Sequence, residues 1–146
     1  MEPTQAHFRR LEAMYRQAKA NVYWRPTLTV REGEAEVSLE VRSDFHHPGN
    51  AAHGATCFKV LDDATFFAAN SLSEHFLLTV SFNLHLLRPI ADGVLHTIGR
   101  VVHRSRRLYV AEGVAYDSNG HEIARGGGTF MPSAIDIAAI NIAQTA

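Results

Sequence analysis

The residues best suited to chemistry are two adjacent carboxylates, Asp62 and Asp63, inside a long apolar segment. The segment runs from Ala55 to about Leu72 and follows directly on His53 and Gly54. Its length and composition predict a buried helix, and burial of an unpaired carboxylate is energetically costly. We therefore expect at least one of the two carboxylates to have a function that justifies its burial.

The predicted first turn of this helix offers N–H groups that favour a negatively charged ligand atom. The N–H of Gly54 lies in an amino-terminal turn, where unpaired N–H groups and the helix dipole favour negative charge. Asp62 follows His53 by nine positions, which on an ideal helix is roughly 13 Å along the axis and about half a turn around it. One helix cannot direct both groups at the same atom. In the simpler interpretation, Gly54 only begins the helix and His53 only caps it.

The neighbouring polar residues have simpler interpretations. A step of about 100° per residue turns Asp63 away from Asp62, so we expect Asp63 to pair with Lys59, four residues earlier. Cys57 is expected to be a small buried apolar residue rather than a nucleophile. The histidines around position 47 have no matched cysteines or carboxylates at metal-ligand spacing, so no metal is predicted.

Hydrophobic periodicity predicts the elements that position these residues. Thr4 can cap a first helix over about residues 4–20, on which Phe8, Leu11 and Tyr15 form an apolar stripe. Alternation then predicts six strands, two before the long helix and four after it: about residues 27–31, 35–42, 77–86, 95–103, 108–116 and 121–130. We expect one domain over residues 1–146, with a core at about 27–132. The tail, 133–146, is expected to form a short helix that docks on the domain or on a partner chain.

Composition excludes several classes of function. The 146 residues have a formal net charge of −1, which gives no reason to expect a nucleic-acid or anionic-membrane surface. No apolar run approaches the ~20 residues that span a bilayer. The first residues lack a basic, apolar signal segment, and the single cysteine cannot form an internal disulfide. We therefore expect a soluble, cytoplasmic protein whose partners are small molecules or other protein chains.

Antiparallel strands with one polar face, together with one apolar helix, predict an α+β fold in which a curved sheet wraps around the helix. The loop at residues 46–55, the Asp62 that follows it, and residues 79–89 resemble the hotdog-fold acyl-CoA thioesterases of the phenylacetate-pathway (PaaI-like) type. The resemblance extends over about residues 27–130. It implies a homodimer whose two sheets join, with two active sites at the subunit interface. A dimer of dimers is also compatible with it, and no metal or redox cofactor is implied.

The resemblance also implies roles for individual residues. Asp62 matches the catalytic carboxylate, which acts as a general base on water or as a nucleophile. His53 orients the turn at Gly54 or donates a further hydrogen bond. Thr79 matches a hydroxyl position that holds the attacking water or steadies Asp62; in the simpler interpretation it is only a strand residue. Independently of the resemblance, Phe66 is expected to pack in the core or to line the acyl pocket, as aromatic residues in ligand sites do.

A basic cluster offers a site for coenzyme A. Arg104, Arg106 and Arg107 stand at one predicted strand connection, where guanidinium groups suit the phosphates of the nucleotide. The resembled family places nucleotide contacts near this turn. The alternative is a solvated basic turn without a ligand.

The chain also departs from the family pattern at three positions near the proposed substrate. His47 replaces an asparagine, Asn50 replaces a glycine, and Ala55 replaces the second glycine of the motif. In one interpretation Asn50 supplies the missing amide from a shifted position, and in the other the site is altered. The departures also leave room for His47 to act as an additional acid or base. Two other functions stay open: a non-catalytic dimer that binds acyl-CoA, and a hotdog hydratase or dehydratase, for which the sequence has no evident acid-base motif.

Overall fold

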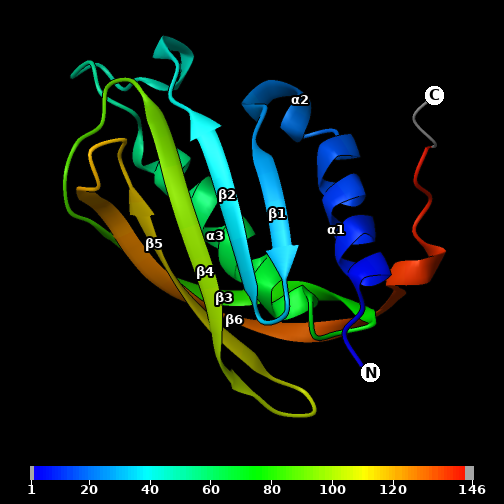
Figure 1. Ribbon diagram of the computed structural model, residues 1–146. Coiled ribbons are helices and arrows are strands. Elements are labelled where there is room, and N and C mark those ends of the chain that lie inside the picture. Colours follow the sequence, from blue (N-terminus) through cyan, green and yellow to red (C-terminus); the bar gives the residue numbers. More distant parts are fainter. Residues whose placement is uncertain (1, 144–146) are drawn as a thin grey trace.

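The computed structural model describes residues 2–143 and shows a curved antiparallel sheet around one long helix (Figure 1). The helix is α3 (Gly54–Asn70). The strand order is β1-β2-β4-β5-β6-β3, with β1 (Thr27–Arg31), β2 (Glu34–Glu40), β3 (His75–Leu86), β4 (Val94–Arg104), β5 (Tyr109–Tyr116) and β6 (Glu122–Asp136). This arrangement confirms the predicted α+β class and hotdog fold. No helix in the described part of the chain is long and apolar enough to cross a membrane.

α3 packs closely on the sheet because β4 has a glycine where the helix crosses it. An added Cβ on Gly99 of β4 would lie 2.5 Å from the carbonyl oxygen of Ala64, a separation that a real side chain cannot adopt. Most of α3 is buried against the sheet, and the less buried residues form one stripe: Gly54, Ala55, Phe58, Lys59, Asp62 and Asp63. The two carboxylates therefore lie at the border of the core rather than inside it.

The first helix, α1 (Gln5–Gln17), begins as predicted, because the Thr4 hydroxyl accepts a hydrogen bond from the N–H of His7 at 3.1 Å. It ends three residues earlier than predicted. The chain turns there into a short helix, α2 (Asn21–Trp24), that the sequence analysis did not predict. The buried Asn21 side chain donates to the carbonyl oxygen of Tyr15 at 2.8 Å, which gives this carbonyl near the end of α1 a second donor beside the N–H of Ala18.

The predicted carboxy-terminal helix is mostly absent. Residues 133–136 continue β6 because β3 extends far enough to pair with them, with His75 opposite Asp136. One 3₁₀ turn follows, η2 (Ile137–Ala139). The Arg10 side chain donates to the carbonyl oxygens of Ile137 and Ala138, each at 3.1 Å. The described part of the tail thus docks on α1 of its own chain.

One long edge of the sheet is apolar. Within residues 2–143, β3 pairs only with β6, and its side chains Leu78, Val80 and Leu86 are 52%, 57% and 57% exposed. Phe58 of α3 lies beside this edge, with its ring 5.3 Å from that of Phe82. We define this edge of β3 and the less buried stripe of α3 as the open edge. A long apolar edge strand is a template for pairing with another chain.

Candidate active site

Asp62 lies in a hollow of about 350 Å³ between α1, α3 and β3. The Thr79 hydroxyl donates to Asp62 Oδ1 at 3.0 Å. Phe66 lines the same hollow, and its ring also packs on Phe67, Phe76 and Phe130. The structure thus brings together three of the predicted site residues, at one end of an aromatic hollow.

The surroundings of Asp62 change its acidity. Burial raises the pKa of this carboxyl from 3.8 to about 6, against the opposing effect of the Thr79 hydrogen bond. The negative charge of Asp63 raises the pKa further, and the positive charge of Lys59 lowers it. A carboxyl with this pKa is ionised at neutral pH yet basic enough to accept a proton from water.

Replacing Thr79 with valine should shift the acid limb of the pH profile of kcat/KM. The hydroxyl donates to the ionised form of Asp62 and therefore lowers its pKa. In the wild type, the rise of kcat/KM with pH should be centred near pH 6, because the pKa of Asp62 is about 6. Without the hydroxyl, we expect this midpoint to shift upward by ~0.5–1 pH unit. The measurement is kcat/KM from pH 4.5 to 9. Thr79→Ser, which keeps the hydroxyl, is the matched control, and an unchanged limb in Thr79→Val would contradict the assignment.

Gly54 lies in a second hollow, of about 260 Å³, that His47, Cys57 and Arg88 also line. His53 precedes it as the amino-terminal cap of α3, with Nδ1 accepting from the N–H of Ala55 at 3.0 Å. The N–H of Ala55 is therefore occupied, whereas the N–H of Gly54, the first residue of the helix, has no intrahelical partner. Burial raises the pKa of the Cys57 thiol to about 11, so this thiol is neutral.

The loop before α3 contains His47 and Asn50, two of the three positions at which the chain departs from the family pattern. His47 Nδ1 accepts from the N–H of Gly49 at 2.9 Å, so the neutral ring carries its proton on Nε2 and can act as a donor. Asn50 has a φ of +63°, a left-handed conformation that asparagine tolerates as glycine does. Its side chain is exposed and lines neither hollow. Within residues 2–143, no cluster of three His, Cys, Asp or Glu side chains is arranged to hold a metal ion.

The two hollows do not meet within one chain. They share no lining residue, and Asp62 lies eight positions after Gly54, roughly 12 Å along the helix axis. Both hollows reach β3, through Leu86 at one end and Thr79 at the other. A single chain therefore separates the N–H of Gly54 from the carboxylate of Asp62, and both groups lie along the open edge.

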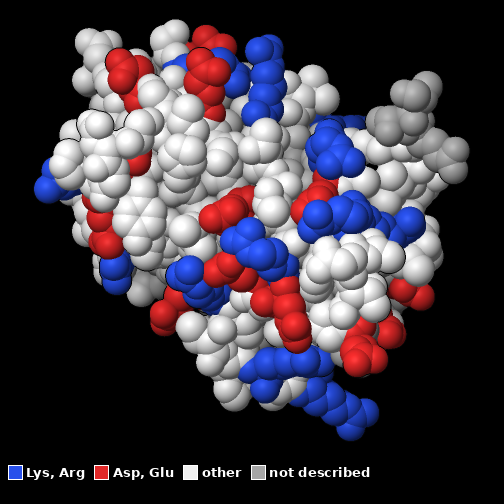
Figure 2. Space-filling model, viewed as in Figure 1, with Lys and Arg blue, Asp and Glu red and all other residues white. Residues whose placement is uncertain are grey.

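The basic cluster forms the tip of the β4–β5 hairpin, which projects from the body of the molecule (Figure 1), and its arginine side chains give that tip a positive surface (Figure 2). A bulge between Val101 and His103 changes the register of β4, so Arg104 pairs with Tyr109. Tyr109 pairs in turn with Phe130, and Phe130 with Thr79. Residues directly opposite each other share a face of the sheet, so the bulge turns Arg104 to the face that carries Thr79. Three strand spacings separate them, roughly 14 Å.

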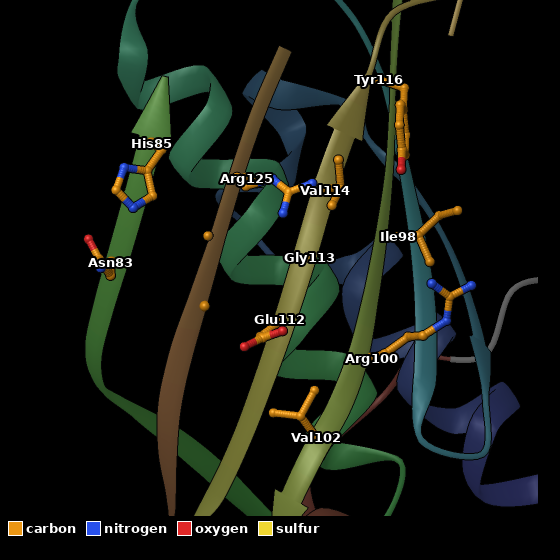
Figure 3. A pocket seen from close by; sticks show the side chains of 12 residues that line it. Asn83, His85, Ile98, Arg100, Val102, Glu112, Gly113, Val114, Tyr116 and Arg125 are labelled. Carbon is orange, nitrogen blue, oxygen red and sulfur yellow. The ribbon is translucent and has the colours of Figure 1, made fainter. Parts of the chain in front are cut away.

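A hollow larger than these two lies elsewhere, on the outer face of the sheet, and measures about 530 Å³ (Figure 3). Arg100, Glu112, Arg125 and His85 line it, with none of the predicted site residues. Two of its guanidinium groups are already paired, Arg100 with Glu34 and Arg125 with Glu122. Size alone therefore does not identify the site.

Asp63 confirms one prediction and reveals a partner that the sequence analysis missed. Lys59 Nζ lies 2.8 Å from Asp63 Oδ2, the pair expected from four-residue spacing. The Tyr15 hydroxyl of α1 also donates to Asp63 Oδ2, at 2.6 Å. The sequence offered only the position of Tyr15 on the apolar stripe of the first helix, which indicates burial but no partner.

Comparisons with known proteins agree with this fold. The model of the thioesterase superfamily matches residues 49–124, just over half of the chain. The solved structure of the PaaI protein from the phenylacetic acid degradation operon of E. coli matches with a TM-score of 0.85 at 19% identity, covering 92% of this chain and 99% of that one. A thioesterase family protein from Silicibacter pomeroyi matches with a TM-score of 0.77 at 27% identity, over 84% and 95% of the two chains. A protein of Sulfurisphaera tokodaii named "Putative esterase" is 26% identical over 99 residues, which are 68% of this chain and 74% of that one. The chain therefore belongs to the thioesterase superfamily.

Proposed function

We propose that this protein is an acyl-CoA thioesterase, which hydrolyses an acyl-CoA to a free carboxylic acid and coenzyme A. The observation that carries the proposal is Asp62 in its aromatic hollow, hydrogen-bonded to Thr79 and with a raised pKa. In a member of the thioesterase superfamily, this carboxylate is the group suited to attack. An acyl-CoA substrate also fits the expected cytoplasmic location.

The proposed active site is completed by a second copy of the chain. If two open edges meet around a two-fold axis, the two α3 helices run antiparallel and the sheets join through β3. Gly54 of one subunit then approaches Asp62 of the other, and the axis makes the same site twice. The exposed apolar side chains Leu78, Val80 and Phe58 support this pairing. A dimer of dimers would leave this arrangement unchanged.

In the proposed reaction, the N–H of Gly54 donates to the thioester carbonyl oxygen as negative charge develops there. The ionised Asp62 of the other subunit takes a proton from water, whose oxygen attacks the carbonyl carbon. In the alternative route, Asp62 attacks directly and the mixed anhydride is then hydrolysed. In both routes the carbon–sulfur bond breaks, the sulfur leaves as a thiol after gaining a proton, and water supplies the second oxygen of the acid.

The tip of the β4–β5 hairpin is the proposed binding site for the phosphates of coenzyme A, which a long flexible arm separates from the thiol. Arg104→Ala should raise KM by roughly tenfold with little change in kcat, because one charge-assisted contact to phosphate is lost. Arg106→Ala and Arg107→Ala should have smaller effects in the same direction. Arg100→Ala is the matched control, since Arg100 lies on β4 before the bulge and lines the outer hollow. Equal KM values in Arg104→Ala and the wild type would favour a solvated basic turn.

The experiment that tests the function is the release of free thiol from a panel of aliphatic and aromatic acyl-CoAs by the wild-type chain. Turnover of one substrate class supports the thioesterase. Saturable binding without thiol release would favour the non-catalytic dimer. Addition of water to an unsaturated acyl-CoA, with the thioester intact, would favour the hydratase.

A further inference from the structure

Three side chains form a compact cluster next to Asp62, which we call the Asp63 cluster: Tyr15, Lys59 and Asp63. One atom, Asp63 Oδ2, receives both contacts, from the Tyr15 hydroxyl at 2.6 Å and from Lys59 Nζ at 2.8 Å. The Lys59 and Asp63 side chains are 17% and 15% exposed. Low exposure weakens screening by solvent, so these charges act strongly on their neighbours.

The cluster is fixed from two elements. Lys59 and Asp63 lie one turn apart on α3, and Tyr15 comes from α1, where its ring packs edge-on against Phe67 at 5.1 Å. Burial raises the pKa of Tyr15 above its usual value, so its hydroxyl stays a neutral donor. Lys59 Nζ also lies 5.5 Å from the centre of the Tyr15 ring. The ion pair is therefore held in one place by the packing of α1 on α3.

The charges that act on Asp62 within the chain come from this cluster. Among the residues that line its hollow, Tyr15, Lys59 and Asp63 are the other titratable groups from α1 and α3, and β3 contributes the uncharged Thr79. The two charges oppose each other, since Asp63 disfavours the ionised form of Asp62 and Lys59 favours it. As long as both are present, Lys59 offsets part of the effect of Asp63 on Asp62.

We propose that Lys59 and Asp63 are positioning residues for the reaction. They form an ion pair that Tyr15 anchors to α1, and the charges of this pair set the pH above which Asp62 reacts. The inference rests on the proposed function for its effect on rate. Its effect on the ionisation of Asp62 is a property of the folded protein and can be measured without turnover.

The two single variants should act in opposite directions. Lys59→Met leaves the Asp63 charge uncompensated, so we expect the ionisation of Asp62 to move upward by ~0.5–1 pH unit. Asp63→Asn leaves the Lys59 charge uncompensated, so the ionisation should move downward by a similar amount. The double variant should return close to the wild type. Lys59→Arg keeps the charge, and Tyr15→Phe removes a hydrogen bond without a charge, so each should shift the ionisation much less.

The experiment uses two readouts on the full-length protein: the ¹³C NMR titration of the Asp62 carboxyl, and the acid limb of kcat/KM for thiol release. Opposite shifts in the single variants, cancelled in the double variant, are expected in both readouts. A merely structural cluster would lower the melting temperature of every variant without shifts of opposite sign, and that result would overturn the inference. Opposite NMR shifts in a protein that cleaves no thioester would leave the inference standing and contradict the proposed function. If Lys59→Met does not fold, Lys59→Gln and Asp63→Asn still give the two directions.

Discussion

Replacing Asp62 with asparagine is expected to lower kcat for thiol release by about 10³-fold, within the range that a general base or nucleophile contributes. Asparagine has nearly the same shape and can still accept a hydrogen bond from Thr79, but it cannot take a proton from water or form an anhydride. The measurement is kcat at pH 8, where Asp62, with a pKa of about 6, is fully ionised in the wild type.

The stability of the same variant separates lost chemistry from lost folding. The folded protein raises the pKa of Asp62 from 3.8 to about 6, so ionised Asp62 opposes folding above that range. Asp62→Asn should therefore be at least as stable as the wild type at pH 8, and this advantage should disappear below about pH 4. Asp63→Asn is the matched control, because it removes the adjacent carboxylate and should keep most of its kcat at pH 8. Turnover by Asp62→Asn close to the wild-type rate would exclude Asp62 as the attacking group.

Replacing Gly54 with proline is expected to lower kcat by roughly 10²- to 10³-fold, the usual cost of one oxyanion donor. Proline lacks the N–H in question and is favoured at the first position of a helix. The preceding residue tolerates it as well, since His53 has a φ of −58° and a ψ of 145°. The substitution thus removes the proposed donor without breaking α3.

Gly54→Ala is the matched control, because alanine keeps the N–H. Alanine and proline both add a Cβ, which would lie 2.8 Å from the end of the flexible Leu86 side chain, so they share the steric cost. We expect Gly54→Ala to lose much less activity than Gly54→Pro. Equal losses would assign the effect to crowding, and full activity in Gly54→Pro would remove the N–H from the mechanism.

The elements were predictable from sequence because they depend on local patterns. Alternation identified all six strands, and the four-residue spacing identified the pair of Lys59 and Asp63. Tyr15 was missed as a partner of Asp63, since α1 and α3 meet only through tertiary packing. The bulge that turns Arg104 toward the inner face was also missed, because an extra residue in a strand leaves the hydrophobic pattern almost unchanged.

The boundaries that failed were set by contacts from elsewhere in the chain. β6 continues to Asp136 because the distant β3 pairs with it. α1 stops at Gln17, and the buried Asn21 side chain then donates to the carbonyl oxygen of Tyr15. Asn50, which stands where the family has glycine, has a positive φ, a conformation that asparagine tolerates and that the spacing of residues in the loop does not predict.

The central claim is that Gly54 of one subunit works with Asp62 of the other. The most direct test mixes two inactive proteins, Asp62→Asn and Gly54→Pro, that carry different affinity tags, and isolates the heterodimer after subunit exchange. One of its two sites then combines the intact Gly54 of the first chain with the intact Asp62 of the second, so we predict about half of the wild-type kcat per dimer. A heterodimer confirmed by native mass spectrometry that releases no thiol would contradict the shared site.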